Sequence, residues 1–208
     1  ATTIKVHASM MSRALKRFGI TRKKKTLRAS EQDREDVQLQ RETFFEKLEG
    51  VDVNDIFVLD ESSCNTAMTR LYARAPKGER AHAKAPRNWG KNITMLCVIS
   101  TQKVETGMIF EGALNGEFFL LFVKEWLAPL LRPGQVVIMD NLSSHKVAGV
   151  AEAIEARGAR IQYLPPYSPD FSPIENMFSK VKTFLRGRGA RSKEKLLEAI
   201  PAALDTVV

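Results

Sequence analysis

The sequence has 208 residues, of which 44% are hydrophobic and 27% are charged, and its formal net charge is +8. A chain of this length can bury a sizeable core, so we expect one main domain with a small appendage. The longest apolar runs, such as FFLLFV at 118–123, are far too short to cross a bilayer, and no secretory signal stands at the start. Because the first residue is Ala1, we expect a fragment or a trimmed product.

The two cysteines, Cys64 and Cys97, each stand alone without a CxxC-type partner. This spacing argues against a zinc site, and nothing in the sequence supports a disulfide. We therefore expect both cysteines to be reduced and mostly buried in a cytoplasmic protein.

The excess positive charge is confined to the first 30 residues. They contain nine basic residues and no acidic residue, whereas the rest of the chain holds 23 basic and 24 acidic residues. A basic arm of this kind is typical of nucleic-acid binding, because each neutralised phosphate releases counterions. The alternative is a solvated, disordered tail. If the arm binds DNA, its expected contacts are Arg13, Lys16, Arg17, Lys23, Lys24 and Lys25.

The first predicted helix lies at 8–20, ASMMSRALKRFGI, with Ser9 as its N-cap and Gly19 as its C-cap. Its apolar residues share one face and its basic residues share the other. This pattern suits the last helix of a helix-turn-helix whose earlier helices lie upstream. We therefore expect 1–28 to be the C-terminal part of a helix-turn-helix DNA-binding region.

A second, strongly charged helix is predicted at 30–50. It begins with a capping pattern from Ser30 to Asp33 and ends at Gly50. Its apolar residues are spaced as in a packed helix only toward its end. We assign 29–50 to a linker helix that docks onto the main domain.

The remainder, 51–208, forms the predicted main domain. Three consecutive strands followed by an α-β-α-β-α pattern argue for an α/β fold with one mixed sheet and helices packed on its faces. The hydrophobic patterns predict strands at 55–60, 69–75, 92–100, 135–140 and 160–164, and helices at 116–131, 144–158, 173–186 and 192–206.

Two acids follow solid apolar strands: IFVLD ends in Asp60 and VVIMD ends in Asp140. Each acid is therefore expected to terminate a buried strand. Adjacent strands lie about 4.8 Å apart, so two such ends side by side would bring both carboxylates within reach of one cation. Bare carboxylates would repel each other, whereas a divalent metal such as Mg²⁺ would stabilise both. The alternative is that each Asp caps the turn after its strand.

Glu175 follows the four prolines of YLPPYSPDFSPIENMF, at 163–178. Ser172-Pro173-Ile174-Glu175 fits a capping box, in which Ser172 is the N-cap and Glu175 the N3 residue. Alternatively, the stiff lead-in holds the Glu175 carboxylate in one place. The local pattern does not choose between a helix cap and a functional acid.

Three motifs, VLDES, VIMDNLSSHK and LPPYSPDFSPIENMFSKVK, resemble in order the catalytic motifs of the mariner-like transposase superfamily. The nearest branch is the bacterial insertion-sequence transposases with a D-D-E catalytic domain. The resemblance spans about 51–206, and the 34 residues between Asp140 and Glu175 match the spacing typical of this group.

The resemblance implies an RNase H-like fold for 51–208, a mixed five-stranded sheet flanked by helices and preceded by the partial helical DNA-binding segment. It implies that Asp60 ends the first strand, that Asp140 ends the fourth, and that Glu175 lies on a helix beside them. These three acids would be the catalytic residues and would hold two Mg²⁺ ions, for which Mn²⁺ substitutes. The motif match selects Glu175 over Asp170, and in the same way Asp60 over Glu61.

The ligand and cap roles compete for the same Glu175 side chain. We expect the prolines to fix the start of the helix, with Glu175 turned toward metal held by Asp60 and Asp140. Without metal, Glu175 is expected to fold back as a cap or to swing away from the two Asp residues.

Three further residues are candidates for supporting roles. Asn141 and Asn176 each follow a proposed ligand, where an amide could orient a carboxylate or a metal-bound water. Ordinary turn and helix-surface roles are the alternative. His145 lies five residues after Asp140, near a predicted helix start. It could contact a phosphate or the attacking group, and the alternative is a capping or packing role.

Two basic segments of the main domain are expected to contact DNA phosphates. The segment 70–91 has seven basic residues against one acid, and its Trp89 either stacks on a base or anchors the core. The segment 180–195 begins on the predicted Glu175 helix, and its alternative is a solvated helix face. The expected contacts are Arg70, Lys77, Arg80, Lys84, Arg87, Trp89, Lys91, Lys180, Lys182, Arg186 and Arg188.

These motifs predict a DNA transposase that cleaves element ends and joins them to target DNA. Its partners would be terminal inverted repeats and target DNA, bound by a homodimer or a higher assembly in a bacterial cytoplasm. One alternative is an RNase H-like metal-dependent nuclease without strand transfer, and another is a catalytically silent, transposase-derived DNA-binding protein. The complete set of acids argues against the silent protein, and their order and spacing favour the transposase over the nuclease.

Overall fold

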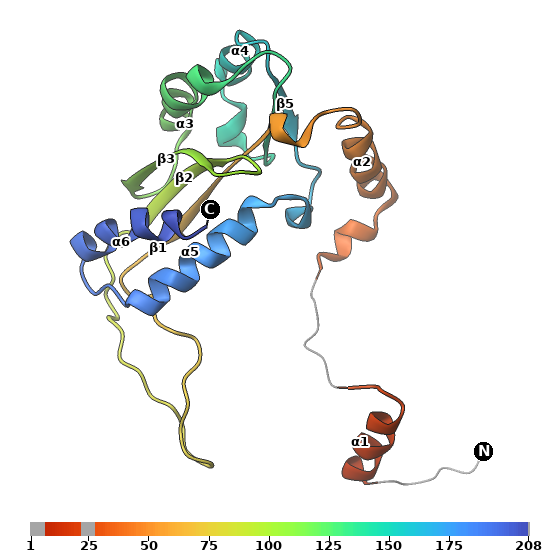
Figure 1. Ribbon diagram of the computed structural model, residues 1–208, viewed down its shortest axis with the longest axis vertical. Coiled ribbons are helices and arrows are strands. Elements are labelled where there is room, and N and C mark those ends of the chain that lie inside the picture. The colour runs from red at the N-terminus through yellow and green to blue at the C-terminus, as the bar shows by residue number, and fades with distance from the viewer. Residues whose placement is uncertain (1–6, 22–27, 208) are drawn as a thin grey trace. The chain divides into compact units, whose positions relative to one another are not determined.

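A computed structural model describes residues 7–21 and 28–207 (Figure 1). Contacts between residues divide the chain into two units, one ending at Ser30 and the other beginning at Glu31. The predicted basic contacts Lys23, Lys24 and Lys25 lie outside the described residues. None of the helices in the described ranges has the length and hydrophobicity needed to cross a bilayer.

The first unit contains helix α1, Ala8–Arg17, where a helix was predicted. Its N-cap is His7, whose Nδ1 accepts a hydrogen bond from the Ser9 N–H at 3.3 Å, so the prediction of Ser9 as the cap is wrong. Gly19 follows with a φ of 71°, a left-handed conformation common after helices. No residue of α1 is buried, and its assignment to a helix-turn-helix stays a prediction.

The second unit contains the predicted mixed five-stranded sheet, with strand order β3-β2-β1-β4-β5. β1 pairs antiparallel with β2 and parallel with β4, β2 pairs antiparallel with β3, and β4 pairs parallel with β5. The strands are β1 (Ile56–Cys64), β2 (Ile93–Ile99), β3 (Val104–Glu111), β4 (Val136–Met139) and β5 (Arg160–Tyr163).

One strand prediction is wrong, and one strand was not predicted. The segment 69–75 is not a strand but part of an exposed loop, where Tyr72 is 86% exposed. Its alternating pattern finds no partner, since the segment pairs with neither edge strand of the sheet, β3 or β5. The third strand is instead β3, in which Gly107 packs so closely that a Cβ there would lie 3.3 Å from the Cys97 sulfur.

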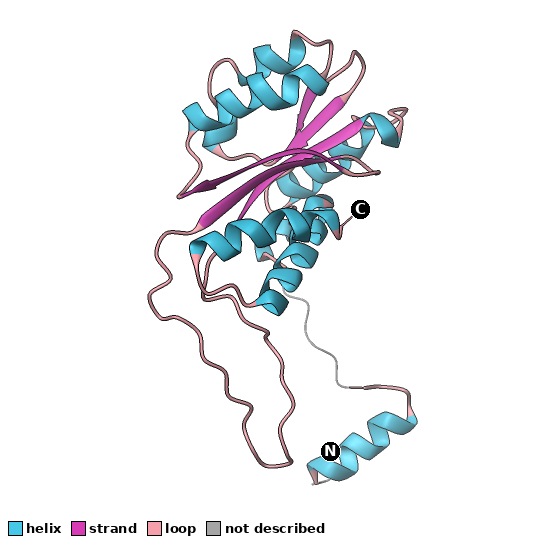
Figure 2. Ribbon diagram, turned by 60° about the vertical axis from the view of Figure 1, so that its left-hand side comes forward, coloured by secondary structure: helices cyan, strands magenta, loops and turns pink. Residues whose placement is uncertain are grey.

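Two groups of helices cover opposite faces of the sheet (Figure 2). Helices α2, α5 and α6 contribute to the core on one face, together with Val58 and Ile138. Helices α3 and α4 contribute to the core on the other face, together with Leu59 and Met139. The helix bounds are α2 (Glu35–Glu46), α3 (Gly116–Phe122), α4 (Val150–Glu155), α5 (Ile174–Arg188) and α6 (Lys193–Asp205).

Some predicted helices are interrupted. The segment 30–50 begins with a 3-10 turn, and α2 starts only after Arg34, whose backbone is extended at ψ 137°. The segment 144–158 is split at Gly149, which has a φ of 95°. A bulkier residue at Gly149 would need this left-handed conformation and would also press against Leu120. The predicted helix at 116–131 continues from α3 through a π-helical turn and a 3-10 turn.

Both cysteines are free and buried, as expected from their isolated positions. Cys97 lies in the centre of β2, directly opposite Asp60 of β1. Burial first, and then the nearby Asp60 carboxylate, raise the pKa of the Cys97 thiol to about 12. A thiol of this kind stays protonated and packs as an apolar side chain.

The packing of α5 generates a stability prediction. Phe178→Ala removes a side chain that is 2% exposed in the core between α5 and the sheet. We expect it to lower the free energy of unfolding by about 3–5 kcal/mol. The matched control is Phe118→Ala, which removes a ring that is 42% exposed and should cost about 1 kcal/mol or less. Urea denaturation of both variants checks this, and equal losses would contradict the described packing.

Candidate active site

The parallel pairing of β1 and β4 brings Asp60 and Asp140 together. The last paired residues of this ladder are Leu59 and Met139, and the two acids come immediately after them. Asp140 therefore follows the end of its strand, as predicted. Asp60 does not end its strand, because β1 continues to Cys64, paired with Ile93 of β2. The end of the β1–β4 ladder, rather than the end of β1, places the Asp60 carboxylate.

Strand alternation separates Asp60 from its neighbour Glu61. Val58 contributes to the core on the α5 face of the sheet, so Asp60, two residues later, faces the same way. Glu61 faces the opposite side, where its Oε2 lies 3.1 Å from Nε2 of His145. The structure thus supplies a geometric reason to choose Asp60 over Glu61.

Glu175 lies in the first turn of α5 and lines the same pocket as Asp60 and Asp140. The predicted capping box is not formed, since no side-chain hydrogen bond caps α5. The Ser172 hydroxyl is buried and, among the described residues, has no hydrogen-bond partner. The Glu175 carboxylate is therefore not folded back as a helix cap.

The pocket has a volume of about 630 Å³. One of its walls is formed by the lead-in to α5, the Pro-rich segment 164–173. Within the described residues, no three His, Cys, Asp or Glu side chains converge closely enough to hold one ion. The three acids therefore share a pocket without forming a complete coordination sphere. The lining residues are Asp60, Asp140, Asn141, Leu142, Leu164, Pro165, Pro166, Tyr167, Ser168, Pro169, Ser172 and Glu175.

The pocket is electrostatically unfavourable for the Asp60 carboxylate. Burial is the main cause that raises its pKa, and the hydrogen bond from the Glu61 N–H at 2.7 Å partly offsets it. The carboxylates of Glu61, Asp140 and Glu175 raise it further, to about 7. A divalent cation would relieve this repulsion, so the donor set and its charge fit a hard metal ion.

His145 is fully buried, stacks on Phe119 at 4.2 Å between ring centroids, and bridges two acids. Its Nδ1 lies 2.5 Å from Oδ1 of Asp140, and its Nε2 contacts Glu61. Burial lowers its pKa, but the two carboxylates outweigh burial and raise it to about 9. This environment matches the packing alternative, and the ring has no surface with which to contact a phosphate.

For Asp140, burial would raise the pKa, but His145 and the Leu142 N–H lower it overall. The surroundings therefore favour the anion of Asp140, whereas they favour the protonated form of Asp60. Sequence reasoning missed the link from Glu61 through His145 to Asp140. The only available signal was the presence of an acid and a histidine next to the two proposed ligands.

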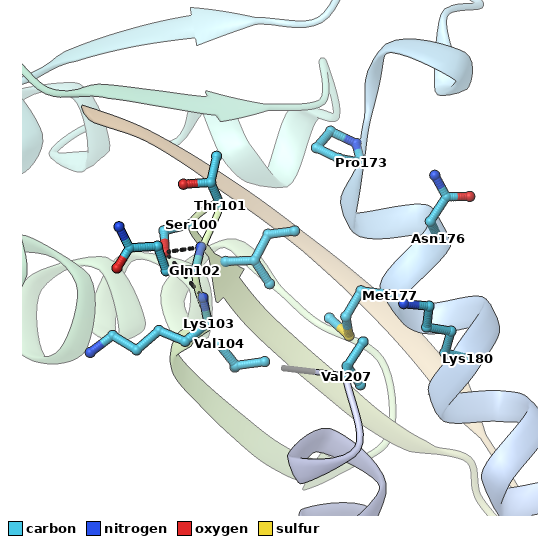
Figure 3. Close-up of a pocket in the computed structure, with 11 residues that line it drawn as sticks. Ser100, Thr101, Gln102, Lys103, Val104, Pro173, Asn176, Met177, Lys180 and Val207 are labelled. Carbon is cyan, nitrogen blue, oxygen red and sulfur yellow. Dashed lines mark hydrogen bonds between the residues drawn. The ribbon is translucent and has the colours of Figure 1, made fainter. Parts of the chain in front are cut away.

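The two candidate asparagines lie in different places. Asn141 lines the pocket of the three acids. Asn176 lines a separate pocket of about 230 Å³, between α5 and the turn that joins β2 to β3 (Figure 3). Its neighbours there include Lys180 and Lys103. The structure therefore does not bring Asn176 into the candidate site.

The rival acid Asp170 is engaged elsewhere, in a salt bridge with Arg41 of α2 at 2.7 Å. It lies in the lead-in to α5, where Tyr167 has a φ of 55°. Tyr167 is the one described non-glycine residue with a positive φ, a conformation that is costly for a bulky side chain. Glu175 lines the pocket and Asp170 does not, while the catalytic role of Glu175 stays a prediction.

The basic segment between β1 and β2 projects from the sheet as a long extended loop (Figures 1 and 2). Trp89 is 45% exposed, so the alternative that it anchors the core is wrong, and stacking on a base stays a prediction. Lys91 is exposed but forms an ion pair with Glu111 at 3.6 Å. The predicted contacts that the structure places at exposed positions are Arg70, Lys77, Arg80, Lys84, Arg87, Trp89, Lys91, Lys180 and Arg188, together with Arg13, Lys16 and Arg17 of α1.

Two predicted contacts on α5, Lys182 and Arg186, are only partly exposed. Arg186 lines a pocket at the base of the projecting loop, with Arg70 and Tyr72. The end of α5 and the start of the loop therefore form one basic surface. The role of this basic surface in DNA binding stays a prediction.

Comparison with known proteins identifies a family that covers most of the chain. The model of a protein family described as DDE superfamily endonuclease matches residues 55–197. No curated protein matches the sequence significantly.

Solved structures of Mos1 complexes have a similar fold. The Mos1 strand transfer complex matches with a TM-score of 0.69 at 16% identity, over 95% of this chain and 62% of that chain. The Mos1 transposase paired-end complex with left transposon end matches with a TM-score of 0.63 at 16% identity, over 96% and 68%. The Mos1 mariner paired end complex with Mn matches with a TM-score of 0.62 at 16% identity, over 97% and 69%. The chain thus spans less than two thirds of the first of these proteins, and the similarity confirms the RNase H-like fold expected from the motifs.

The raised pKa of Asp60 generates a pH prediction for the metal-free protein. Folding raises this pKa from 3.8 to about 7, so Asp60 contributes stability when protonated and loses it as the pH rises through that window. Asp60→Asn cannot ionise. We compare the free energy of unfolding of Asp60→Asn with that of the unmodified chain. From pH 5 to pH 8 this difference should change by about 2 kcal/mol in favour of Asp60→Asn, after allowance for partial solvent access.

Urea denaturation in EDTA at both pH values measures this difference. Glu198→Gln, which neutralises an exposed acid on α6, is the control and should show no such change. A pH-independent difference between Asp60→Asn and the unmodified chain would contradict the described environment of Asp60.

Proposed function

Because this chain belongs to the DDE superfamily endonuclease family, we propose that it is the catalytic part of a DNA transposase. In this proposal it cleaves element ends and joins them to target DNA. The observation that carries the proposal is the shared pocket of Asp60 from β1, Asp140 after β4 and Glu175 from α5. Three acids from separate elements, one of them with a pKa raised to about 7, are an arrangement suited to metal-dependent phosphoryl transfer.

We propose that Asp60, Asp140 and Glu175 hold two Mg²⁺ ions, for which Mn²⁺ substitutes. When bound, the ions supply activation of the attacking water or 3′-hydroxyl and stabilisation of the leaving oxygen in an in-line displacement. The Asp140 carboxylate is oriented by His145 and by the Leu142 N–H, and that of Asp60 by the Glu61 N–H. Glu175 completes the set by moving toward the two Asp residues. A covalent protein nucleophile is not needed.

The proposed substrates are terminal inverted repeats and target DNA, bound by a homodimer or a higher assembly. The Mos1 structures are strand transfer and paired-end complexes, one with a left transposon end and one with Mn, which supports this proposal by analogy. On this chain, the exposed basic residues of α1, the projecting loop and the end of α5 supply charge for the DNA backbone. The insertion-sequence branch and the cytoplasmic location remain part of the proposal.

The first test offers terminal DNA and Mg²⁺ or Mn²⁺ to the full-length protein and scores cleavage and joining separately. Asp140→Ala and Glu175→Ala should each slow cleavage by about 1,000-fold or more, because several kcal/mol of transition-state stabilisation are lost. The control Asp205→Asn removes an exposed acid at the end of α6 and should cleave normally. Cleavage that survives Asp140→Ala would overturn the metal assignment, and cleavage without joining would favour the nuclease.

The projecting loop generates a separate prediction on DNA affinity. A triple variant, Arg74→Ala, Lys77→Ala and Arg80→Ala, should weaken DNA binding and reduce the slope of log K against log salt by about 2–3. The reason is that each lost phosphate contact releases one fewer counterion. Gel-shift titrations at several salt concentrations measure the slope.

The matched control removes three exposed basic residues on the α3–α4 side of the sheet: Lys124, Arg132 and Arg157. It changes the net charge by the same amount, so it should leave the slope nearly unchanged. If both triple variants reduce the slope equally, the loop has no specific role in DNA binding.

A further inference from the structure

Helix α2 holds the lead-in to α5 through one arginine. The Arg41 guanidinium donates to both carboxylate oxygens of Asp170, from Nη1 at 3.1 Å and from Nη2 at 2.7 Å. Nη1 also donates to the Ser168 hydroxyl at 2.6 Å. The Arg41 side chain is only 19% exposed, so this pair is partly shielded from water. Parallel bonds of this kind fix orientation as well as distance.

The same guanidinium lies over the ring of Phe171, 3.8 Å from its centroid. Two aromatic rings of α2 also contact Phe171. Phe44 stacks on it with 5.6 Å between ring centroids, and Phe45 meets it edge-on with 4.6 Å between centroids. Arg41 therefore contacts three residues of the lead-in: Ser168, Asp170 and Phe171. Phe44 and Phe45 of the same helix also pack against Phe171. A lysine at position 41 could neither bind the carboxylate with two parallel bonds nor stack on the ring in this way.

The N-terminal side of α2 adds a contact to the same segment. The Gln32 side-chain amide donates to the main-chain carbonyl of Tyr167, the residue with the left-handed backbone. The Ser168 hydroxyl, itself bound by Arg41, donates to the Pro166 carbonyl at 3.0 Å. The conformation of the segment is thus imposed from outside, by α2 and the turn before it, as well as by its own prolines.

This segment leads directly to Glu175. Four residues after Phe171, Glu175 lies in the first turn of α5, and its N–H donates to the Ser172 carbonyl at 3.3 Å. Within the described residues, no hydrogen bond or ion pair holds the Glu175 carboxylate itself. Its place relative to Asp60 and Asp140 therefore depends on where the lead-in sets the start of α5.

We propose that Arg41 is a positioning residue for the site. Its contacts with Ser168, Asp170 and Phe171 set the start of α5. The position of this start brings Glu175 to the pocket of Asp60 and Asp140. Helix α2, which lies outside the sheet and before its first strand, is in this way part of the catalytic apparatus. The catalytic consequence rests on the proposed function, whereas the positioning of Glu175 does not.

The test compares Arg41→Ala, Arg41→Lys and Asp170→Asn with the unmodified chain. Each should slow cleavage about 10- to 100-fold and weaken Mn²⁺ binding about tenfold, with DNA affinity unchanged within twofold. The double variant Arg41→Ala with Asp170→Asn should be no worse than the more impaired single variant, because both remove one interaction. Mn²⁺ binding is read by electron paramagnetic resonance, and DNA affinity by gel shift.

A matched control lies at the start of the same helix, where Arg34 is the N-cap residue. Arg34 and Asp36 form another two-bond ion pair, at 2.7 and 3.0 Å, but both side chains are exposed, at 58% and 55%, whereas the Arg41 side chain is 19% exposed. Arg34→Ala should leave cleavage and Mn²⁺ binding unchanged. If Arg34→Ala causes the same losses as Arg41→Ala, or if Arg41→Ala causes none, the proposal is overturned.

Amide hydrogen exchange over 172–178 tests the positioning without metal or DNA. Arg41→Lys and Asp170→Asn, which preserve side-chain size, should raise exchange there at least tenfold while the β1 and β4 amides stay protected. Unchanged exchange overturns the proposal even if cleavage is slower. If the unmodified chain shows no cleavage, the proposed function fails, and the exchange result still decides whether Arg41 sets the start of α5.

Discussion

The parallel pairing of β1 with β4 is the constraint on which the site depends. A one-residue shift in this register would turn Asp60 or Asp140 to the wrong face of the sheet, because side chains alternate along a strand. The ladder ends at Leu59 and Met139, both buried, so the register is fixed by the core on either side of the sheet. Burial of apolar side chains thus secures two carboxyl groups at the end of this ladder.

The third acid reaches the site by a different route. Asp60 and Asp140 are fixed by sheet hydrogen bonds, whereas Glu175 arrives on a helix whose start is set by loop packing. The pocket is consequently rigid on one side and adjustable on the other. This asymmetry accounts for three acids that line one pocket without converging on one point among the described residues.

The sequence allowed prediction of the sheet and of the acids, but not of everything that holds them. Solid apolar runs identified β1, β2 and β4 because both faces of these strands are buried. The polar residues after Asp60 resembled a turn, since the pairing that extends β1 to Cys64 comes from a strand 29 residues downstream. In the same way, the alternation at 69–75 carried no information about whether a partner strand was available.

The supporting contacts of the site were beyond local patterns. Glu61 and His145 are 84 residues apart, and Arg41 and Asp170 are 129 apart. The cap or ligand question at Glu175 also could not be settled locally, because both roles use the same residue types at the same spacing. The structure shows the Ser172 hydroxyl without a partner among the described residues, which removes the cap but not the ligand role.

The projecting loop has a consequence for how proteins of this kind can diversify. It joins two antiparallel neighbours, β1 and β2, whose pairing is already secured by a long ladder from Val58 to Cys64. Lengthening such a connection lowers stability only slightly, since each doubling of the length of a flexible loop costs about 0.6 kcal/mol in closure entropy. The loop is therefore free to vary in length and charge, while Asp60, four residues before the last residue of β1, stays in register.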